Sequence, residues 1–266
     1  LYDEIGRPVE AGELRTPSPT TVTEAIVKTP ASWDTWIASG QRSEVTRSYY
    51  DESLSVGISA KFEGGQTYLR NRIATVAYYD YNYTGTVLAY DHATHYTYDL
   101  HGNVKEVIYE NPELEYIGQS DKSTQYEYEL ISGNVKKVSY QKGKADAYYH
   151  KYLYDADNRL DKAFSSRNDY LYDQEAHYHY YHHGPLARVE TGDWQVQGTD
   201  YAYTINGWLK GVNSNHLSLE HDMGKDGHKN YYSTTNWIHK EVGIDAFGFT
   251  LGYFEGDYEA IYDNVF

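Results

Sequence analysis

The sequence contains no cysteine and only one methionine among its 266 residues. Without cysteine the chain has no disulfide framework, no thiol nucleophile and no Cys-ligated zinc. Basic residues are also few, because 23 Lys and Arg stand against 39 Asp and Glu, for a formal net charge of −16. This balance disfavours binding to nucleic acid or to anionic lipid, which both require a basic surface. No segment approaches 18 consecutive apolar residues, so we expect no transmembrane segment.

The usual catalytic signatures are missing as well. No Gly-rich phosphate loop follows a strand pattern, and neither G-x-S-x-G nor H-E-x-x-H occurs. We therefore expect no enzymatic activity and no cofactor. The excess of negative charge is typical of solubility charge on a secreted protein. The chain starts with LYDEIGRPVE and stops at YDNVF, which we interpret as the ends of a piece cut from a larger polypeptide.

Tyrosine, by contrast, is abundant. The chain has 32 Tyr against 6 Phe and 5 Trp. Aromatic side chains favour pleated, half-buried strands. A Tyr ring can pack on one side while its hydroxyl stays hydrogen-bonded or wet. The composition therefore predicts an all-β protein with polar sheet surfaces.

One phrase recurs along the chain. It consists of alternating aromatics, a Tyr-Asp pair or its relic, two or three spacers, a Gly or Asn step, and an aliphatic residue. Five copies read YTYDLHGNVKEV, YEYELISGNVKKV, YLYDADNRLDKA, YHYYHHGPLARV and YAYTINGWLKGV, and a shorter one, YDEIGRP, stands near the start of the chain. Their second aromatics, Tyr98, Tyr128, Tyr154, Tyr180 and Tyr203, follow one another at intervals of 30, 26, 26 and 23 residues. This regularity indicates an internal repeat rather than chance turn signals in an unrelated all-β domain.

Each phrase is typical of a β-hairpin. The Y-x-Y alternation places both rings on one face of a strand. The Asp can accept backbone hydrogen bonds just ahead of it, and the Gly or Asn supplies the positive φ of a tight turn. We predict sheet through residues 90–213 with turns centred on Gly102, Gly133, Asn158, Gly184 and Gly207. The structural repeat anchors are Tyr2, Asp3, Gly6, Tyr98, Asp99, Gly102, Asn103, Tyr128, Gly133, Asn134, Tyr154, Asp155, Asn158, Tyr180, Gly184, Tyr203 and Gly207.

A single hairpin is only marginally stable in water, so the repeats must stand edge to edge in a continuous sheet. The phrases resemble the YD or RHS repeats of bacterial surface and toxin-delivery proteins, most clearly over residues 90–213. The segment 245–264 is similar to material that follows the repeats in members from gliding bacteria with type IX secretion. The resemblance implies a spiralling shell or cocoon that encloses a C-terminal toxin domain or is carried on the cell surface. It implies as partners the remainder of the same polypeptide, an enclosed toxin domain and secretion machinery.

The boundaries that follow from this reading divide the chain into four parts. Residues 1–14 are the end of an upstream repeat, 15–89 an irregular insert with a short helix and strands, 90–213 the repeat array, and 214–266 a loop-rich segment leading into further strands. The helix is predicted in ASWDTWIASG, with Ser32 as N-cap and Gly40 as stop. Trp33, Trp36 and Ile37 share one face of that helix, which we expect to plug the sheet.

Two clusters suggest metal ligands. Asp222, Asp226 and Asn230 faintly resemble a calcium loop, but their spacing fails the EF-hand pattern, and a solvated loop is the better interpretation. His177 and His179 would share a strand face, with Glu175 as a third zinc ligand and His182 and His183 at the adjacent turn. We favour histidine standing in for Tyr at repeat positions and expect no bound metal.

The sequence therefore predicts a structural shell segment of a large secreted or cell-surface bacterial protein, which encloses or presents a C-terminal polypeptide. A cell-surface adhesin with a glycan- or protein-binding surface is the first alternative, because exposed Tyr and Trp stack on sugars and partner proteins. A zinc-dependent activity at the histidine hairpin is the second.

Overall fold

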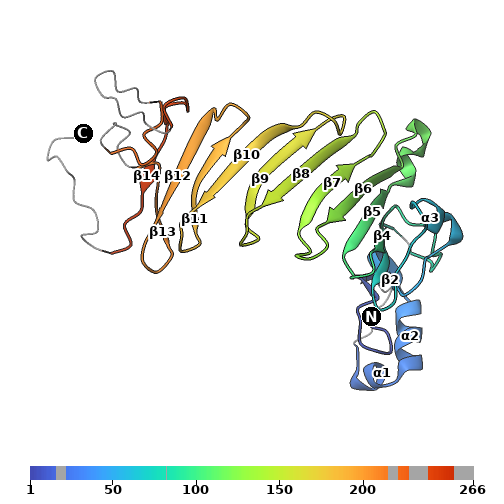
Figure 1. The fold of residues 1–266 in the computed structure, drawn as a ribbon. Coiled ribbons are helices and arrows are strands. Elements are labelled where there is room, and N and C mark those ends of the chain that lie inside the picture. Colours follow the sequence, from blue (N-terminus) through green and yellow to red (C-terminus); the bar gives the residue numbers. More distant parts are fainter. Residues whose placement is uncertain (16–21, 82, 215–220, 228–238, 255–266) are drawn as a thin grey trace, which may run out of the picture. The chain divides into compact units, whose positions relative to one another are not determined.

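The computed structural model describes residues 1–15, 22–81, 83–214, 221–227 and 239–254 (Figure 1). The chain forms two compact units, Leu1–Glu127 with Val138–Ala147, and Tyr128–Lys137 with Tyr148–Phe266. Fourteen antiparallel strands and a few short helices are described, so the protein is all-β. None of the described helices has the length and apolar character needed to span a membrane.

The first unit is a sheet in which neighbouring strands follow chain order. Each strand pairs antiparallel with the next. Its strands are β1 (Glu10–Arg15), β2 (Gln41–Tyr50), β3 (Ile73–Tyr79), β4 (His92–Tyr98), β5 (Val104–Glu110) and β6 (Asp121–Tyr128). Its helices are α1 (Glu24–Lys28), α2 (Pro30–Ala38), α3 (Val56–Ala60) and the 3₁₀ helix η1 (Pro112–Ile117).

The second unit repeats the same up-and-down order. The two strands of each hairpin, β8–β9, β10–β11 and β12–β13, pair antiparallel. Successive hairpins also pair antiparallel, through β9–β10 and β11–β12. The residues of β7 (Val135–Tyr140) are divided between the two units. The remaining strands are β8 (Tyr148–Tyr154), β9 (Leu160–Ser166), β10 (Asp173–Tyr180), β11 (Leu186–Thr191), β12 (Gln197–Tyr203), β13 (Leu209–Val212) and β14 (Phe249–Thr250).

The anchor tyrosines occupy the same place in each hairpin. Tyr98 pairs with Val104, the first residue of the return strand, directly after a register shift. A bulge of this kind increases the local twist and bends the strand. The same shift precedes the corresponding residue in the other hairpins, at Tyr50, Tyr154, Tyr180 and Tyr203.

The hydrophobic clusters of the described residues lie in the first unit. Tyr79, Tyr83 and Tyr90 form one cluster with small neighbours, and Tyr96 and Tyr98 pack together on Leu69. Both rings of a Y-x-Y phrase therefore do lie on one face. Ile58 and Phe62, from the loop between β2 and β3, cover Ile108 of β5.

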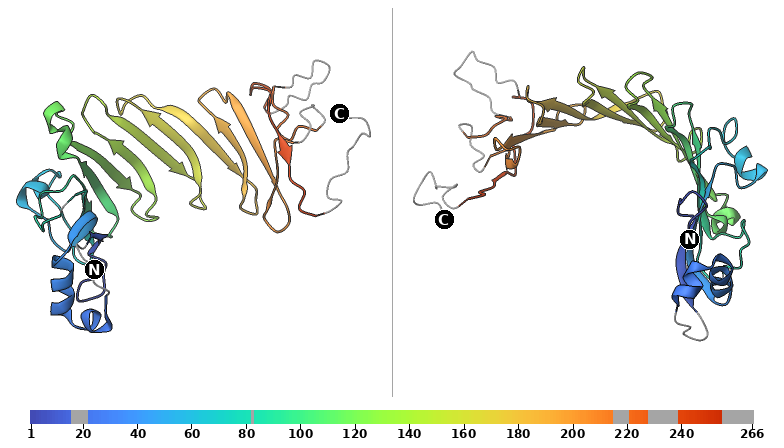
Figure 2. Two further views of the ribbon diagram at one scale, coloured as in Figure 1. Left: turned by 180° about the vertical axis from the view of Figure 1, so that it is seen from behind. Right: turned by 90° about the horizontal axis from the view of Figure 1, so that it is seen from below.

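The predicted helix is present but begins earlier than expected. Thr29 is its N-cap and Pro30 its first residue, so Ser32 lies inside the helix and the N-cap prediction was wrong. Proline favours this position because its fixed φ suits the first turn and its missing N–H is not needed there. Trp33 and Trp36 stack with ring centroids 5.2 Å apart. Together with Leu14 they line a cavity of about 500 Å³. Figure 2 shows α2, in blue, close to the N-terminus of the chain.

The turns of the hairpins depend on residues with positive φ. Gly102 has φ +96°, and a Cβ there would lie 2.6 Å from the Arg72 guanidinium. The turns predicted at Gly133, Gly184 and Gly207 also have positive φ, and at Asn158 an asparagine takes the same conformation with φ +60°.

We expect Gly102→Ala to lower the free energy of unfolding by about 1–2 kcal/mol, since a side chain in this backbone region clashes with its own carbonyl. Gly57→Ala is the matched control, because Gly57 lies in α3 with ordinary φ and its nearest neighbour to a new Cβ is 3.7 Å away. Urea unfolding of both variants measures the difference. Equal stability of the two variants would contradict the strained turn.

Candidate functional site

The repeated turn has one hydrogen-bond pattern. The N–H of Asp155 donates to the carbonyl of Arg159 at 2.9 Å, and the N–H of Asn158 donates to the carbonyl of Asp155 at 3.1 Å. The Asp155 carboxylate also accepts from the N–H groups of Asp157 and Arg159, both at 2.9 Å. The same backbone pair joins Asp3 to Arg7 and Gly6, Asp99 to Asn103 and Gly102, Tyr181 to Pro185 and Gly184, and Thr204 to Trp208 and Gly207.

The Asp of the phrase is held ionised by this turn. The hydrogen bond from the Arg159 N–H lowers the pKa of Asp155 most, and the guanidinium, with Nε at 2.8 Å, lowers it further. For Asp99, burial alone would raise the pKa, but hydrogen bonds from the Asn103 side chain and from backbone N–H groups lower it below its ordinary value. A carboxylate that accepts several N–H groups favours its charged form.

Worn copies keep the turn without the Asp. The copy with Tyr128 has one more residue before its glycine than the copy with Tyr98. In it the N–H of Glu129 donates to the carbonyl of Asn134 at 2.7 Å, and the Glu129 side chain accepts from the N–H of Ser132. In the last copy the Thr204 hydroxyl accepts from the N–H of Trp208 at 3.1 Å. The turn therefore forms with Glu or Thr as the side-chain acceptor, as Asx- and ST-turns do, and at Tyr181 the two backbone hydrogen bonds are kept with Tyr in place of the Asp.

The hydroxyl of the anchor tyrosine binds the preceding hairpin. Tyr154 donates to the carbonyl of Val135 at 2.9 Å, and Tyr180 donates to the carbonyl of Leu160 at 2.8 Å. In both cases the acceptor is the first residue of the preceding return strand. The other bonds of this kind are Tyr50 to Pro8 at 2.9 Å, Tyr98 to Ile73 at 2.8 Å and Tyr253 to Leu209 at 2.8 Å.

A cation covers the ring of several anchors. The Arg159 guanidinium lies 4.4 Å from the centroid of the Tyr180 ring. Arg7 and Arg72 cover Tyr50 and Tyr98 in the same way, at 4.2 and 5.4 Å. Each of these arginines directly precedes the residue whose carbonyl the tyrosine binds. The turn of one repeat therefore fixes the anchor of the next by a hydrogen bond and a cation–π contact.

Two of these tyrosines, Tyr50 and Tyr253, were not predicted as anchors from the sequence. Tyr50 and Asp51 form a repeat whose turn is expanded, because the N–H of Asp51 donates to the carbonyl of Arg72 at 3.1 Å across a loop that contains α3. The signal was present in RSYYDE and LRNRIATVAYYD, but the long insertion hid the spacing. Tyr253 takes the anchor position after β13 with Trp208 beside it, ring centroids 5.1 Å apart, where an arginine stands in other copies.

The histidines of β10 meet a glutamate of β11. His177 pairs across the strands with Glu190, and His179 lies two residues further on the same face. The His179 Nε2 is 3.3 Å and the His177 Nδ1 is 3.7 Å from Oε2 of Glu190. Within the described part of the chain, these three residues form a group that could bind a metal ion, because their potential ligand atoms all lie within 4.8 Å of one another. The sequence placed the histidines together correctly but named the wrong carboxylate.

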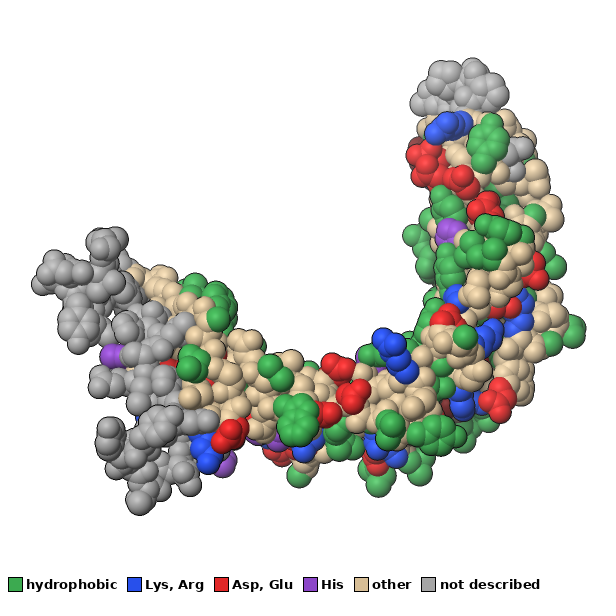
Figure 3. Space-filling model, turned by 90° about the horizontal axis from the view of Figure 1, so that it is seen from above, with side chains coloured by type: hydrophobic (Ala, Val, Ile, Leu, Met, Phe, Trp, Pro, Cys, Tyr) green, Lys and Arg blue, Asp and Glu red, His purple; other side chains and the backbone are tan. Residues whose placement is uncertain are grey.

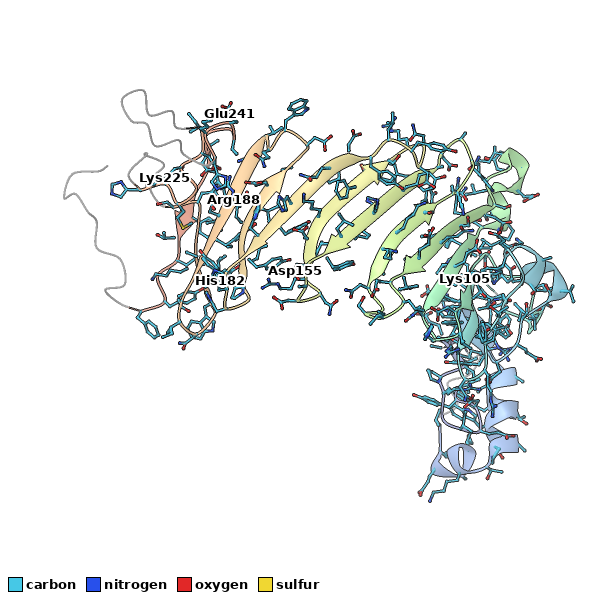
Figure 4. All side chains as sticks on the ribbon, viewed as in Figure 1. Lys105, Asp155, His182, Arg188, Lys225 and Glu241 are labelled. Carbon is cyan, nitrogen blue, oxygen red and sulfur yellow. The ribbon has the colours of Figure 1, made fainter. Side chains whose placement is uncertain are left out.

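The other residues of the zinc hypothesis do not join them. Glu175 is bound to the hydroxyl of Ser165. His182 and His183 are exposed in the turn between β10 and β11, and His183 stacks on Tyr181 at 5.3 Å. Figure 4 shows His182 at the same edge of this unit as Asp155, whereas Arg188 lies toward the opposite edge.

Arg188 is the centre of a buried charged cluster in the second unit. It is 4% exposed and forms ion pairs with Glu190 at 3.1 Å and Asp226 at 2.7 Å, and a further one with Asp200. Its guanidinium lies against the backbone of Gly198, where a Cβ would come within 1.9 Å. Glycine is therefore required there by close approach rather than by its backbone angles.

The acids of this cluster outnumber the cation. Burial, with the neighbouring Asp222 and Asp226, raises the pKa of Asp245 to about 7, and burial raises that of Asp200 to about 6. Asp222 accepts from the N–H groups of Gly224 and Asp226, which folds residues 222–226 into a tight turn. Asp222 and Asp226 are buried, so the solvated loop expected there was wrong for these two side chains. Asn230, the third residue of the calcium hypothesis, lies outside the described residues.

No family model and no curated protein matches the sequence. Among solved structures, the chain is similar to chains of "TcdB2-TccC3 without hypervariable C-terminal region" and of "TcdB2-TccC3-TEV". The identities are 14% and 13%, the TM-score is 0.45 for both, and each match covers 80% of this chain and 10% of the other. A chain of the Photorhabdus luminescens Tc holotoxin pore matches with 11% identity and a TM-score of 0.33, over 80% of this chain and 14% of that one. This chain thus spans a small part of the proteins that it matches, and similarity this low identifies no family.

We expect Tyr154→Phe and Tyr180→Phe each to lower the free energy of unfolding by about 0.5–1.5 kcal/mol, the usual net value of one hydrogen bond. Each change removes the hydroxyl that binds the preceding hairpin and leaves the ring in place. Tyr170→Phe is the control, because that ring is 89% exposed, and it should stay within about 0.5 kcal/mol. Chemical denaturation of the three variants decides the point, and a control as destabilised as the other two would refute the role of the hydroxyls.

We expect Asp245 to lower the stability of the second unit as the pH rises from 5 to 8. Because the pKa of Asp245 rises from 3.8 unfolded to about 7 folded, its contribution is complete below about pH 4 and is lost as the pH passes 7. Asp245→Asn should weaken this pH dependence, since an amide keeps the acceptor for Asn213 and carries no charge. Asp173→Asn, at the exposed start of β10, should leave it unchanged. Thermal unfolding measured from pH 5 to 8 tests both, and an unchanged slope in Asp245→Asn would contradict the assignment.

Proposed function

We propose that this chain is a segment of a YD/RHS-repeat shell in a large secreted or cell-surface bacterial protein. The segment encloses or presents a C-terminal polypeptide, such as a toxin domain. The observation that carries the proposal is the repeated bond between an anchor hydroxyl and the preceding hairpin. The type IX route of secretion is part of the proposal and is supported by the sequence resemblance of residues 245–264.

The repeated bond suits a mechanical role. Several hairpins are each fixed to the neighbouring one by an anchor hydroxyl, a backbone carbonyl and, in three copies, an arginine. A structure in which each repeat contacts only its neighbours extends by adding repeats, and its stability is close to a sum of repeat and interface terms. Such a sheet can cover a large surface without a single large core.

The turn tips present apolar side chains to solvent. In several copies the turn begins with Asp, Glu or Thr, and one or two aliphatic residues follow it directly. These aliphatic side chains are strongly exposed. Leu100 is 71% exposed, Ile131 93% and Ile205 102%. Exposed apolar side chains in a repeating position support contact with further polypeptide. The remainder of the same protein is the partner that we propose.

We infer that the segment itself is not an enzyme. In the described residues, the buried acids of the cluster around Arg188 are bound by Arg188 itself, by Asn213 or by backbone N–H groups. That these acids already have partners within the protein supports the inference.

A surface for glycans or partner proteins is the second candidate. It is supported by exposed rings, with Trp194 87% and Tyr116 84% exposed. On the face visible in Figure 3, however, hydrophobic side chains are interspersed with acidic and basic ones. A mixed surface of this kind is less typical of an adhesive patch than a continuous apolar one.

Limited proteolysis of the full-length polypeptide distinguishes the two candidates. If the segment encloses a C-terminal region, that region should resist cleavage in the native protein, and Tyr154→Phe with Tyr180→Phe should speed its release. Tyr170→Phe should leave the rate unchanged. A C-terminal region cut as fast in the native protein as in the isolated state would refute enclosure. Glycan binding that is lost with Trp194→Ala would favour the adhesin.

A further inference from the structure

The histidine pair of β10 has a feature that the repeat does not explain. His177 and His179 lie with ring centroids 4.0 Å apart, at the positions that His95 and Thr97 take in an earlier copy, beside a glutamate that is 2% exposed. An ionised carboxylate is costly to bury unless a cation or several hydrogen bonds compensate it. Arg188 provides one positive charge, but it is shared with Asp200 and Asp226.

The protonation of His177 is set by a carboxylate behind it. Its Nε2 lies 3.2 Å from the Asp161 carboxylate, so the ring proton belongs on Nε2 and the lone pair on Nδ1. Nδ1 is the atom that faces Glu190, at 3.7 Å. A carboxylate that holds the outer nitrogen of a histidine is the arrangement that supports metal-ligating histidines in proteins.

The second histidine directs its Nε2 nitrogen at the same carboxylate. The Nε2 of His179 is buried and makes no hydrogen bond, although it lies 3.3 Å from Oε2 of Glu190. A buried polar atom without a partner is rare and needs an explanation. The carboxylate itself is held in place by Nε2 of Gln195 at 2.9 Å and by Nε of Arg188 at 3.1 Å.

The distances match the edges of a small coordination polyhedron. Ligand atoms at about 2.0–2.1 Å from a tetrahedral zinc ion are about 3.3 Å from one another. The separations from Glu190 Oε2 are 3.3 and 3.7 Å, and all three ligand atoms lie within 4.8 Å of one another. Two imidazole nitrogens and one carboxylate oxygen are a donor set of zinc sites, whereas calcium prefers six to eight oxygens.

We propose that His177, His179 and Glu190 bind a divalent transition-metal ion of the zinc class, with Asp161 as the residue that positions His177. Three protein ligands leave a fourth position for water or another ligand. The ion places a positive charge against the buried Glu190 and joins β10 to β11 in addition to their backbone pairing. The expectation of no metal treated the histidines as replacements for Tyr and considered Glu175 as the third ligand, whereas the structure places Glu190 beside them.

Zinc titration of the purified full-length protein tests the site. After dialysis against Zn²⁺ and removal of excess ion, elemental analysis should find one equivalent, and calorimetry should give a single binding event. His179→Ala should weaken the binding at least tenfold. Asp161→Asn should weaken it by about 10- to 100-fold, the usual effect of losing a residue that supports a ligand. His182→Ala with His183→Ala is the matched control and should bind as the native protein does.

Two readouts keep the test independent of folding defects. Circular dichroism and gel filtration of His179→Ala, whose side chain is 40% exposed, should match those of the native protein without metal. Co²⁺ in place of zinc should give the visible absorption of a tetrahedral site in the native protein and lose it in His179→Ala. Absence of bound zinc in the native protein would overturn the proposal, as would equal loss of binding in the His182 and His183 control.

Discussion

The hydrogen bond from an anchor tyrosine to the carbonyl at the start of the preceding return strand is the contact on which the repeated architecture depends. It recurs at 2.8–2.9 Å in hairpins of both units. The bond explains why the phrase needs tyrosine rather than phenylalanine, and why the tyrosine must follow a bulge that turns its side chain toward the neighbour. The arginine over the ring adds a second contact from the same neighbour. Because both contacts are local to adjacent hairpins, the sheet can grow without any long-range core.

The two units bury different material on this common plan. The first has hydrophobic clusters built from Tyr, Val, Ala and Ile, and the loop that contains α3 covers part of β5. In the second, a cluster of charged residues is buried, with Arg188, Glu190 and Asp226 each at most 4% exposed. A buried ionic cluster adds less stability than an apolar core of similar volume and ties specific residues into one arrangement. Burial, together with the neighbouring acids, raises the pKa values of Asp200 and Asp245.

The candidate metal site belongs to this second kind of interior. Glu190 serves both as a partner of Arg188 and as the carboxylate that faces the two histidines. A structural shell and a bound ion are compatible, because an ion held between β10 and β11 would reinforce the same hairpin that the Tyr180 hydroxyl ties to β9. The site would then stabilise the sheet at a copy whose phrase has lost its Asp.

The sequence by itself determined the all-β class, the order of hairpins in residues 90–213 and the positions of the turns. This was possible because Asp155, Asn158 and Arg159 make their turn contacts within five residues, so the information is local. The expanded turn after Tyr50 was less visible because a long insertion separates its two halves. Only the tertiary structure decided that Glu190 rather than Glu175 meets the histidines, because that choice depends on the pairing register of β10 with β11. It also decided that Asp226 and Asp245, distant along the chain from Arg188, are buried near it, since no local pattern specifies which loop folds over which strand.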